Sequence, residues 1–169
     1  MEENSVKITF AGNPLTLLGK EIKVGYKAPE FVAVGAGLAP FKLSDVAGKT
    51  VVVAVYPSID TGVCASQNRR FNAEANNMKD VVVLSISCDL PFAQSRFCAA
   101  EGLANIKTIS DHKDMDFGQK YGFWIKELRL LARGTVVIDK TGIVRYVEYV
   151  SEVTHEPDYE AALAVVKSL

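Results

Sequence analysis

The apolar run Thr50–Tyr56 and the turn that follows it constrain the fold of this chain most strongly. The run is rich in β-branched residues and too short for a helix of ordinary length, so it predicts a strand buried on both faces. Pro57 follows the run, and from Cys64 onward apolar residues recur at steps of three or four, which predicts a helix. A buried strand therefore leads through a turn into a helix that begins near Thr61, with Cys64 in its first turn.

This position has chemical consequences for the thiol of Cys64. The first turn of a helix has backbone N–H groups without intrahelical partners and carries the positive end of the helix dipole, and both favour a thiolate. An ordinary cysteine, with a pKa of ~8.5, is only a few per cent ionised at pH 7. The helix terminus supplies at most ~2 kcal/mol, so a strongly activated thiol needs a nearby cation as well. The alternative is that Cys64 is only a small buried hydrophobic residue.

Thr61 allows two interpretations of the same kind. Its hydroxyl either only caps the helix, or caps the helix and also hydrogen-bonds a group held at the sulfur.

Length, charge and cysteine usage limit the class of protein. The chain has 169 residues and a net charge of −1, so we expect one domain over 1–169 and find no electrostatic case for binding nucleic acid or an anionic membrane. No apolar run approaches the ~20 residues of a membrane span, and the N-terminus lacks the pattern of a signal peptide. We therefore expect a cytoplasmic protein with reduced thiols. Its three cysteines form no C-x-x-C pair and it has two histidines, so we expect neither a metal site nor a cofactor.

The remaining pattern alternates strands and helices. It predicts an N-terminal β-hairpin within residues 1–20, short strands at 31–34 and 40–43, a helical turn capped by Ser44, strands at 81–86 and 106–109, helices at 91–101 and 115–121, an irregular apolar stretch at 123–131, a strand pair at 135–138 and 143–149, and a closing helix at 157–169. This order predicts an α/β sandwich. In such folds, a residue between the carboxyl end of a strand and the start of a helix lies on the usual ligand side.

The other two cysteines also allow more than one interpretation. Cys98 lies on the helix at 91–101, and a disulfide requires Cα atoms within ~4.4–6.8 Å of each other. Two cysteines on folded helices rarely satisfy that limit, so a bond between Cys98 and Cys64 implies local unwinding. The alternative is that Cys98 is a buried structural thiol. Cys88 ends an apolar strand without an obvious activating charge, and we expect it to be structural.

Charged and polar candidates complete the set. Arg133, at the entry to the strand at 135–138, either covers apolar surface with its stem or directs its guanidinium at an anion. Gln67 falls away from the apolar face of the Cys64 helix. His112 and His155 are expected in surface loops, although a cysteine hydrolase would need one of them beside Cys64.

Several segments resemble a known family. Residues 57–64 read Pro-Ser-Ile-Asp-Thr-Gly-Val-Cys and fit the peroxiredoxin pattern Pro-x-x-x-Thr-x-x-Cys. The extension of this run to Asn72, the segment Asp89–Cys98, the N-terminal hairpin and the stretch Glu156–Glu160 resemble the bacterial thiol peroxidases, which are atypical two-cysteine peroxiredoxins. The resemblance covers essentially the whole chain. It implies a thioredoxin-like α/β sandwich, with a central mixed sheet flanked by helices and an N-terminal hairpin extension, usually as a homodimer.

The resemblance also implies roles for individual residues. Cys64 corresponds to the peroxidatic cysteine and Cys98 to the resolving cysteine, while Thr61 and Arg133 correspond to the residues that bind and polarise the peroxide. Pro57 corresponds to the residue that shields the sulfur. The implied function is a thiol-dependent peroxidase for hydrogen peroxide and organic hydroperoxides, whose intramolecular disulfide is reduced by thioredoxin. No role for Cys88 follows.

A preference for organic hydroperoxides would suit a pocket lined by Phe92 and the apolar stretch 125–131, and we expect these residues near the sulfur.

Two other functions compete with this one. A thioredoxin-like disulfide reductase is disfavoured because the chain lacks a C-x-x-C pair. A non-catalytic redox-sensing or chaperone module predicts a slow reaction with peroxide and a stable binding partner, so the peroxide rate constant separates it from the peroxidase.

Overall fold

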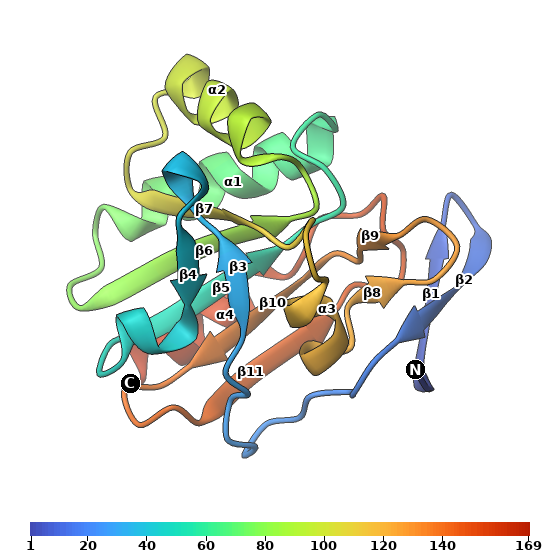
Figure 1. Ribbon diagram of the computed structural model, residues 1–169. Helices are drawn as coiled ribbons and strands as arrows, with labels where there is room; N and C mark the ends of the chain where they lie inside the picture. The colour runs from blue at the N-terminus through green and yellow to red at the C-terminus, as the bar shows by residue number, and fades with distance from the viewer.

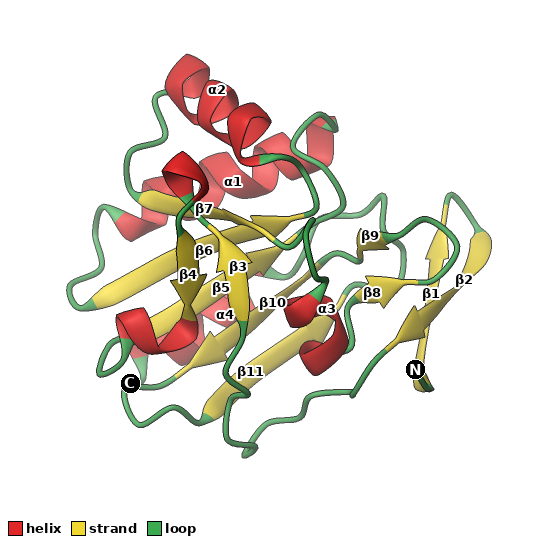
Figure 2. Ribbon diagram, viewed as in Figure 1, coloured by secondary structure: helices red, strands yellow, loops and turns green.

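A mixed β-sheet forms the centre of the computed structural model, which describes residues 1–169 (Figures 1 and 2). Three neighbouring strands at its centre are parallel, and the pairs on either side of them are antiparallel. In spatial order the sheet contains β11 (Val144–Tyr149), β10 (Gly134–Ile138), β5 (Thr50–Val55), β6 (Val81–Ser87), β7 (Ile106–Ser110), β3 (Val32–Val34) and β4 (Pro40–Lys42).

Helices cover both faces of this sheet (Figure 1). The helices are α1 (Gly62–Ala75), α2 (Pro91–Glu101), α3 (Asp116–Tyr121) and α4 (Tyr159–Lys167), with short 3₁₀ turns η1 (Ala36–Leu38) and η2 (Leu43–Val46). On one face Ala54 packs with Phe71 of α1 and Ala162 of α4. On the other face Val53 belongs to the same cluster as Phe117 of α3. These layers confirm the predicted thioredoxin-like sandwich.

The predicted strand–turn–helix around Cys64 is present. All six residues of β5 are buried, as expected for a strand covered on both faces. Thr61 caps α1, so Cys64 lies in the first turn of the helix. The helix that carries Cys98, α2, also has its predicted bounds, with Pro91 at its first position. It ends at Gly102, whose φ of 65° is in the left-handed region that favours glycine.

Two local expectations were wrong. The stretch 123–131 is not irregular, because it contains the short strands β8 (Trp124–Ile125) and β9 (Leu130–Leu131). These strands extend the N-terminal hairpin, β1 (Glu3–Phe10) and β2 (Asn13–Leu18), into a second sheet of four strands. Ser44 does not cap the turn that follows β4, because η2 begins at Leu43, two residues earlier than expected, and its cap is Lys42.

The tip of the N-terminal hairpin is held against the loop that follows β11. The carboxylate of Glu152 accepts hydrogen bonds from the Thr9 hydroxyl at 2.7 Å and from the backbone N–H groups of Ala11 at 2.9 Å and Gly12 at 3.0 Å. These bonds fix Phe10, which lies between Thr9 and Ala11, beside the carboxyl end of the central strands. Among the helices, none combines the length and the apolar character needed to cross a bilayer.

Candidate active site around Cys64

Thr61 contacts Cys64 in two ways. As the cap of α1, its Oγ1 accepts a hydrogen bond from the Cys64 backbone N–H at 3.3 Å. The same hydroxyl donates to Cys64 Sγ, 2.7 Å away. Thr61 is therefore more than a helix cap, because its hydroxyl also contacts the sulfur itself. Because a hydroxyl that donates its proton favours negative charge on the acceptor, Thr61 stabilises a thiolate.

Arg133 directs its guanidinium at the same sulfur. Its Nη2 lies 3.3 Å from Cys64 Sγ, its Nη1 donates to Gln67 Oε1 at 2.8 Å, and its Nε donates to the Val153 carbonyl at 2.8 Å. The side chain is 2% exposed and forms no ion pair with a carboxylate. A buried charge is costly unless a counter-charge lies nearby, and the sulfur is the contacting group that can supply one. The structure thus places a buried guanidinium beside the sulfur, where an activated thiol would require a cation.

Gln67 fixes the orientation of Arg133, a role that we did not predict from the sequence. Its Nε2 donates to the carbonyls of Val55 at 3.2 Å and Gly134 at 3.4 Å, which leaves Oε1 free to accept from Arg133. The side chain is fully buried, so placing it away from the buried face of the helix was wrong. The available signal was its spacing, because residues three positions apart are neighbours on a helix and Gln67 follows Cys64 by one turn.

A buried network of side-chain hydrogen bonds supports the first turn of α1. Asn68 Nδ2 donates to the Cys64 carbonyl at 2.9 Å, and Asn68 Oδ1 accepts from the Ser85 hydroxyl. Ser85 Oγ in turn lies 2.7 Å from the Tyr56 hydroxyl. Burial raises the pKa of Tyr56 well above its ordinary value, so the phenol stays protonated and available for this contact. This network connects the backbone of Cys64 to β6, which carries Ser85, and to the end of β5, which Tyr56 follows.

A small cavity of about 200 Å³ opens beside this cluster. Pro57, Thr61 and Arg133 line it, together with Phe10 from the N-terminal hairpin and Val153 from the loop after β11. The cavity is smaller than the ~300–1,000 Å³ typical of drug-sized ligands, which suits a small substrate. Neither Phe92 nor any residue of the stretch 125–131 lines it, so that expectation was wrong.

The other two cysteines are free thiols that differ in environment. Cys98 is half-buried on α2 beside the Thr108 side chain of β7, and burial raises its pKa. Cys88 Sγ lies 3.2 Å from the Met115 sulfur, and burial raises the pKa of Cys88 to about 12. A thiol with so high a pKa is almost entirely protonated at neutral pH, which agrees with a structural role for Cys88.

Neither histidine lies beside the reactive sulfur. His112 Nδ1 is 2.8 Å from the Ser110 hydroxyl, and His155 is exposed in the loop before α4. The hydrogen-bonding partners of Cys64 Sγ are the Thr61 hydroxyl and the Arg133 guanidinium. A cysteine hydrolase therefore lacks its base at this site.

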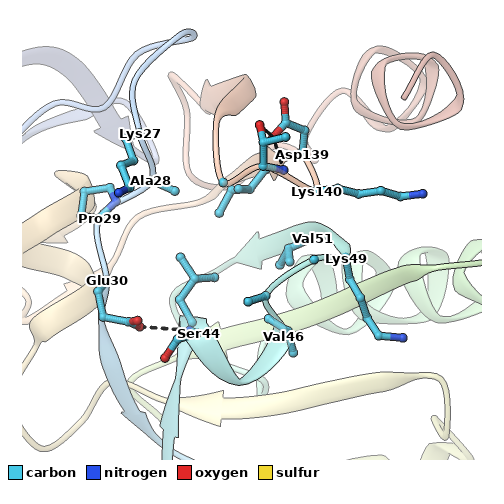
Figure 3. A pocket seen from close by; sticks show the side chains of 16 residues that line it. Lys27, Ala28, Pro29, Glu30, Ser44, Val46, Lys49, Val51, Asp139 and Lys140 are labelled. Carbon is cyan, nitrogen blue, oxygen red and sulfur yellow. Dashed lines mark hydrogen bonds between the residues drawn. The ribbon is translucent and has the colours of Figure 1, made fainter.

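A larger cavity of about 550 Å³ lies at the opposite end of β5, where Lys49 and Val51 line it (Figure 3). The side chains of Lys49 and Lys140 extend outward, and Glu30 accepts a hydrogen bond from the Ser44 N–H at 3.2 Å. Its charged groups do not converge on a common point. The smaller cavity, by contrast, lies beside a thiol that a hydroxyl and a guanidinium both contact.

Comparisons with known proteins agree with this site. A family model described as Redoxin matches residues 23–163. A protein named thiol peroxidase from Halalkalibacterium halodurans is 56% identical over 161 residues, which is 95% of this chain and 97% of that protein. The thiol peroxidase of Bacillus subtilis is 52% identical over 163 residues, covering 96% of this chain and 98% of that protein.

Solved structures give the same result. A peroxiredoxin-like protein from Aquifex aeolicus superimposes with a TM-score of 0.91 at 37% identity, covering 99% of each chain. A thiol peroxidase from Chromobacterium violaceum has a TM-score of 0.86 at 18% identity, covering 98% of this chain and 97% of that one, and it supports the fold alone. The chain therefore belongs to the redoxin family and, within that family, to the thiol peroxidases, which are peroxiredoxin-type enzymes.

Proposed function

We propose that Cys64 is the peroxidatic residue of a hydroperoxide reductase. The observation that carries this proposal is the convergence of the Thr61 hydroxyl and the Arg133 guanidinium on Cys64 Sγ, at 2.7 Å and 3.3 Å. The thiolate attacks the terminal oxygen of a hydroperoxide, so that an S–O bond forms and the O–O bond breaks. Cys64 becomes a sulfenic acid, and the leaving alkoxide or hydroxide takes up a proton to give an alcohol or water.

Three residues assist this step in the proposed mechanism. Thr61 and Arg133 hold the peroxide and stabilise the negative charge that moves from sulfur onto oxygen, since fixed donors in a site shielded from water do so most effectively. Pro57 is buried and lines the cavity, and it shields the sulfur from solvent. With Phe10 and Val153 as apolar walls, the cavity accommodates hydrogen peroxide and small organic hydroperoxides.

Cys98 is the resolving cysteine in this proposal. Its thiolate attacks the sulfenic sulfur of Cys64, an S–S bond forms, and hydroxide leaves and is protonated to water. A dithiol reductant then returns both cysteines to thiols by disulfide exchange and is itself oxidised. We assign this role to a thioredoxin, in the cytoplasm, where free thiols persist.

We further infer that the enzyme is a homodimer. Support comes from Leu90 and Phe92, whose exposed fractions are 51% and 65%, and which lie at the start of α2. Exposed apolar side chains close together on a surface often mark an interface. Sedimentation equilibrium of the reduced protein tests this inference, and a monomer at micromolar concentration contradicts it.

Cysteine variants test the catalytic assignments. Cys64→Ser should abolish peroxide consumption, whereas Cys88→Ser, the matched control, should retain it. Cys98→Ser should complete one turnover and accumulate the sulfenic acid, which a dimedone adduct identifies by mass spectrometry. Retained turnover in Cys64→Ser would reject its role, and a full thioredoxin-driven cycle in Cys98→Ser would point to another resolving residue. A slow reaction of the unmodified protein with peroxide would instead support the redox-sensing or chaperone module.

A further inference from the structure

Asp89 lies at the end of β6 and reaches across to the turn that precedes Cys64. Its Oδ1 accepts a hydrogen bond from the Ser58 hydroxyl at 2.8 Å, and its Oδ2 accepts from the Ile59 backbone N–H at 2.7 Å. Ile59 packs in one small buried cluster with Tyr56 and Cys64. The carboxylate of Asp89 therefore holds the backbone of the turn that places the sulfur.

The same residue anchors the start of the helix that carries Cys98. Asp89 stands two positions before Pro91, the first residue of α2, and its Oδ2 also accepts from the Ser87 hydroxyl at 2.7 Å. Its backbone carbonyl accepts from the Ser110 hydroxyl at 2.5 Å. One side chain thus joins the turn before Cys64 to the beginning of α2.

Side-chain packing reinforces this connection. Phe97, the neighbour of Cys98 on α2, packs against the cluster that contains Cys64. The two cysteine-bearing segments therefore form one closed arrangement, linked at the start of α2 by Asp89 and farther along the helix by Phe97.

The closed arrangement keeps the two sulfurs apart. Cys64 Sγ contacts Arg133, which precedes β10, whereas Cys98 lies beside Thr108 of β7. The strands β5 and β6 lie between β10 and β7. Since neighbouring strands are ~4.8 Å apart, the strands beside the two sulfurs are separated by three spacings, or ~14 Å. A disulfide needs Cα atoms within ~4.4–6.8 Å, so the Cys64 turn, the segment that carries Cys98, or both must open before the bond can form.

Opening also changes the reactivity of Cys98. Burial raises the pKa of Cys98 in the closed arrangement, so little of the attacking thiolate is present there. Exposure to water removes that effect and increases the thiolate fraction.

We propose that Asp89 is a positioning residue for the resolving step: its carboxylate holds the Cys64 turn and the start of α2 in the closed arrangement, and its release controls the rate of Cys64–Cys98 disulfide formation. This inference rests on the proposed function. In the step concerned, the Cys98 thiolate attacks the sulfenic sulfur of Cys64, the S–S bond forms as the S–O bond breaks, and the departing hydroxide is protonated to water.

The variant Asp89→Asn tests the inference. Its amide has one oxygen and one NH₂ group, and the NH₂ group cannot accept a hydrogen bond, so at least one of the bonds that the carboxylate now accepts is lost. We expect disulfide formation to become about ten-fold faster, which corresponds to ~1.4 kcal/mol and lies within the loss expected for a hydrogen bond to a charged group. Reduced protein is mixed with one equivalent of hydrogen peroxide, quenched at short times, and analysed by mass spectrometry for the Cys64 sulfenic acid and the 64–98 link. The peroxide dose that overoxidises half of Cys64 should rise by a similar factor, because a second peroxide competes with Cys98 for the sulfenic acid.

Two further variants complete the experiment. Ser58→Ala removes one donor to Asp89 and should accelerate disulfide formation by a smaller factor, and it decides the question if Asp89→Asn does not fold. Asp139→Asn, the matched control, alters an aspartate that accepts hydrogen bonds from Thr141 and Ile143 in a distant turn, and its rate should equal that of the unmodified protein.

If Asp89 only supported the fold, its replacement would slow both sulfenic acid formation at Cys64 and formation of the 64–98 disulfide. The proposal instead predicts faster disulfide formation without faster sulfenic acid formation. Resolution at or below the unmodified rate in Asp89→Asn and Ser58→Ala, in an experiment where the unmodified protein forms the 64–98 link, overturns the role of Asp89. If the unmodified protein forms no such link, the cysteine assignments fail, and the inference fails with them.

Discussion

Replacing Arg133 by glutamine is expected to slow the reaction of Cys64 with hydrogen peroxide by about one to two orders of magnitude. Glutamine keeps a polar side chain of moderate size but removes the positive charge. The Nη2 atom lies 3.3 Å from Cys64 Sγ, and no carboxylate competes for the guanidinium. The substitution therefore removes the buried cation from beside the attacking sulfur.

The magnitude follows from the distance and from measured hydrogen-bond energies. Two unit charges 3.3 Å apart interact by ~5 kcal/mol at an effective dielectric constant of ~20, which is an upper bound because water and rearranged side chains compensate part of the loss. A hydrogen bond to a charged group contributes ~1.5–3 kcal/mol. Since ~1.4 kcal/mol is a factor of ten in rate, the expected loss lies between about 10-fold and 150-fold.

The assay is the second-order rate constant for hydrogen peroxide, measured by competition with a peroxidase of known rate. Arg145→Gln is the matched control, because its side chain is 46% exposed, pairs with Asp139, and should leave the rate unchanged. Arg133→Lys keeps a charge but cannot maintain three separate contacts, so its rate should be intermediate. A folded Arg133→Gln variant that reacts within three-fold of the unmodified rate would refute the role of the guanidinium.

Three other substitutions test the surroundings of the site. Gln67→Leu removes the acceptor that orients Arg133 and should slow the peroxide reaction about ten-fold in the same competition assay, so an unchanged rate contradicts its positioning role. Gly134→Ala places a Cβ against the Glu148 carbonyl oxygen and should cost about 3 kcal/mol of unfolding free energy, measured by urea titration. An unchanged unfolding free energy would contradict this prediction, because it would mean that the pair β10 and β11 accommodates the methyl group without cost. Burial raises the pKa of Asp111 from its ordinary value of 3.8 to about 7, so its contribution to stability is fully present below about pH 4 and is lost as the pH rises through 7. Asp111→Asn should therefore flatten the fall in unfolding free energy over that interval, and an unaltered slope in urea titrations at several pH values contradicts the assignment.

The parts of the site that depend on short-range signals could be predicted from the sequence. The strand Thr50–Val55, the capping residue Thr61 and the position of Cys64 in the first helical turn are each encoded within a few neighbouring residues. The helix that carries Cys98 was equally predictable, because proline at its start and glycine at its end mark its bounds.

The contacts that activate the thiol could not be predicted in the same way. Arg133 reaches the sulfur because β10 pairs with β5, which sets Gly134 opposite Val55, and strand pairing of this kind leaves no local signature. Without the resemblance to peroxiredoxins, residue patterns left its role open between apolar cover and anion contact. The spacing of Gln67 from Cys64 indicated the face of the helix on which it lies, but its contacts could not be predicted locally, since its partners Val55 and Gly134 lie on two different strands.

The short strands after α3 illustrate a second limit. Two residues show no periodicity, so Trp124–Ile125 and Leu130–Leu131 carry no strand signal of their own. β8 adopts extended structure because the N-terminal hairpin offers an edge, where Leu17 and Leu18 pair with Ile125 and Trp124. β9 in turn pairs with β8.

The hairpin contributes to the wall of the cavity but not to the contacts of the sulfur. The redoxin family model matches residues 23–163, a range that contains the sulfur and the two side chains that contact it. Phe10, which forms part of the cavity wall, lies before that region. Substitutions in the hairpin can therefore change the shape of the cavity, and with it the preferred hydroperoxide. They leave the groups that contact Cys64 Sγ unchanged.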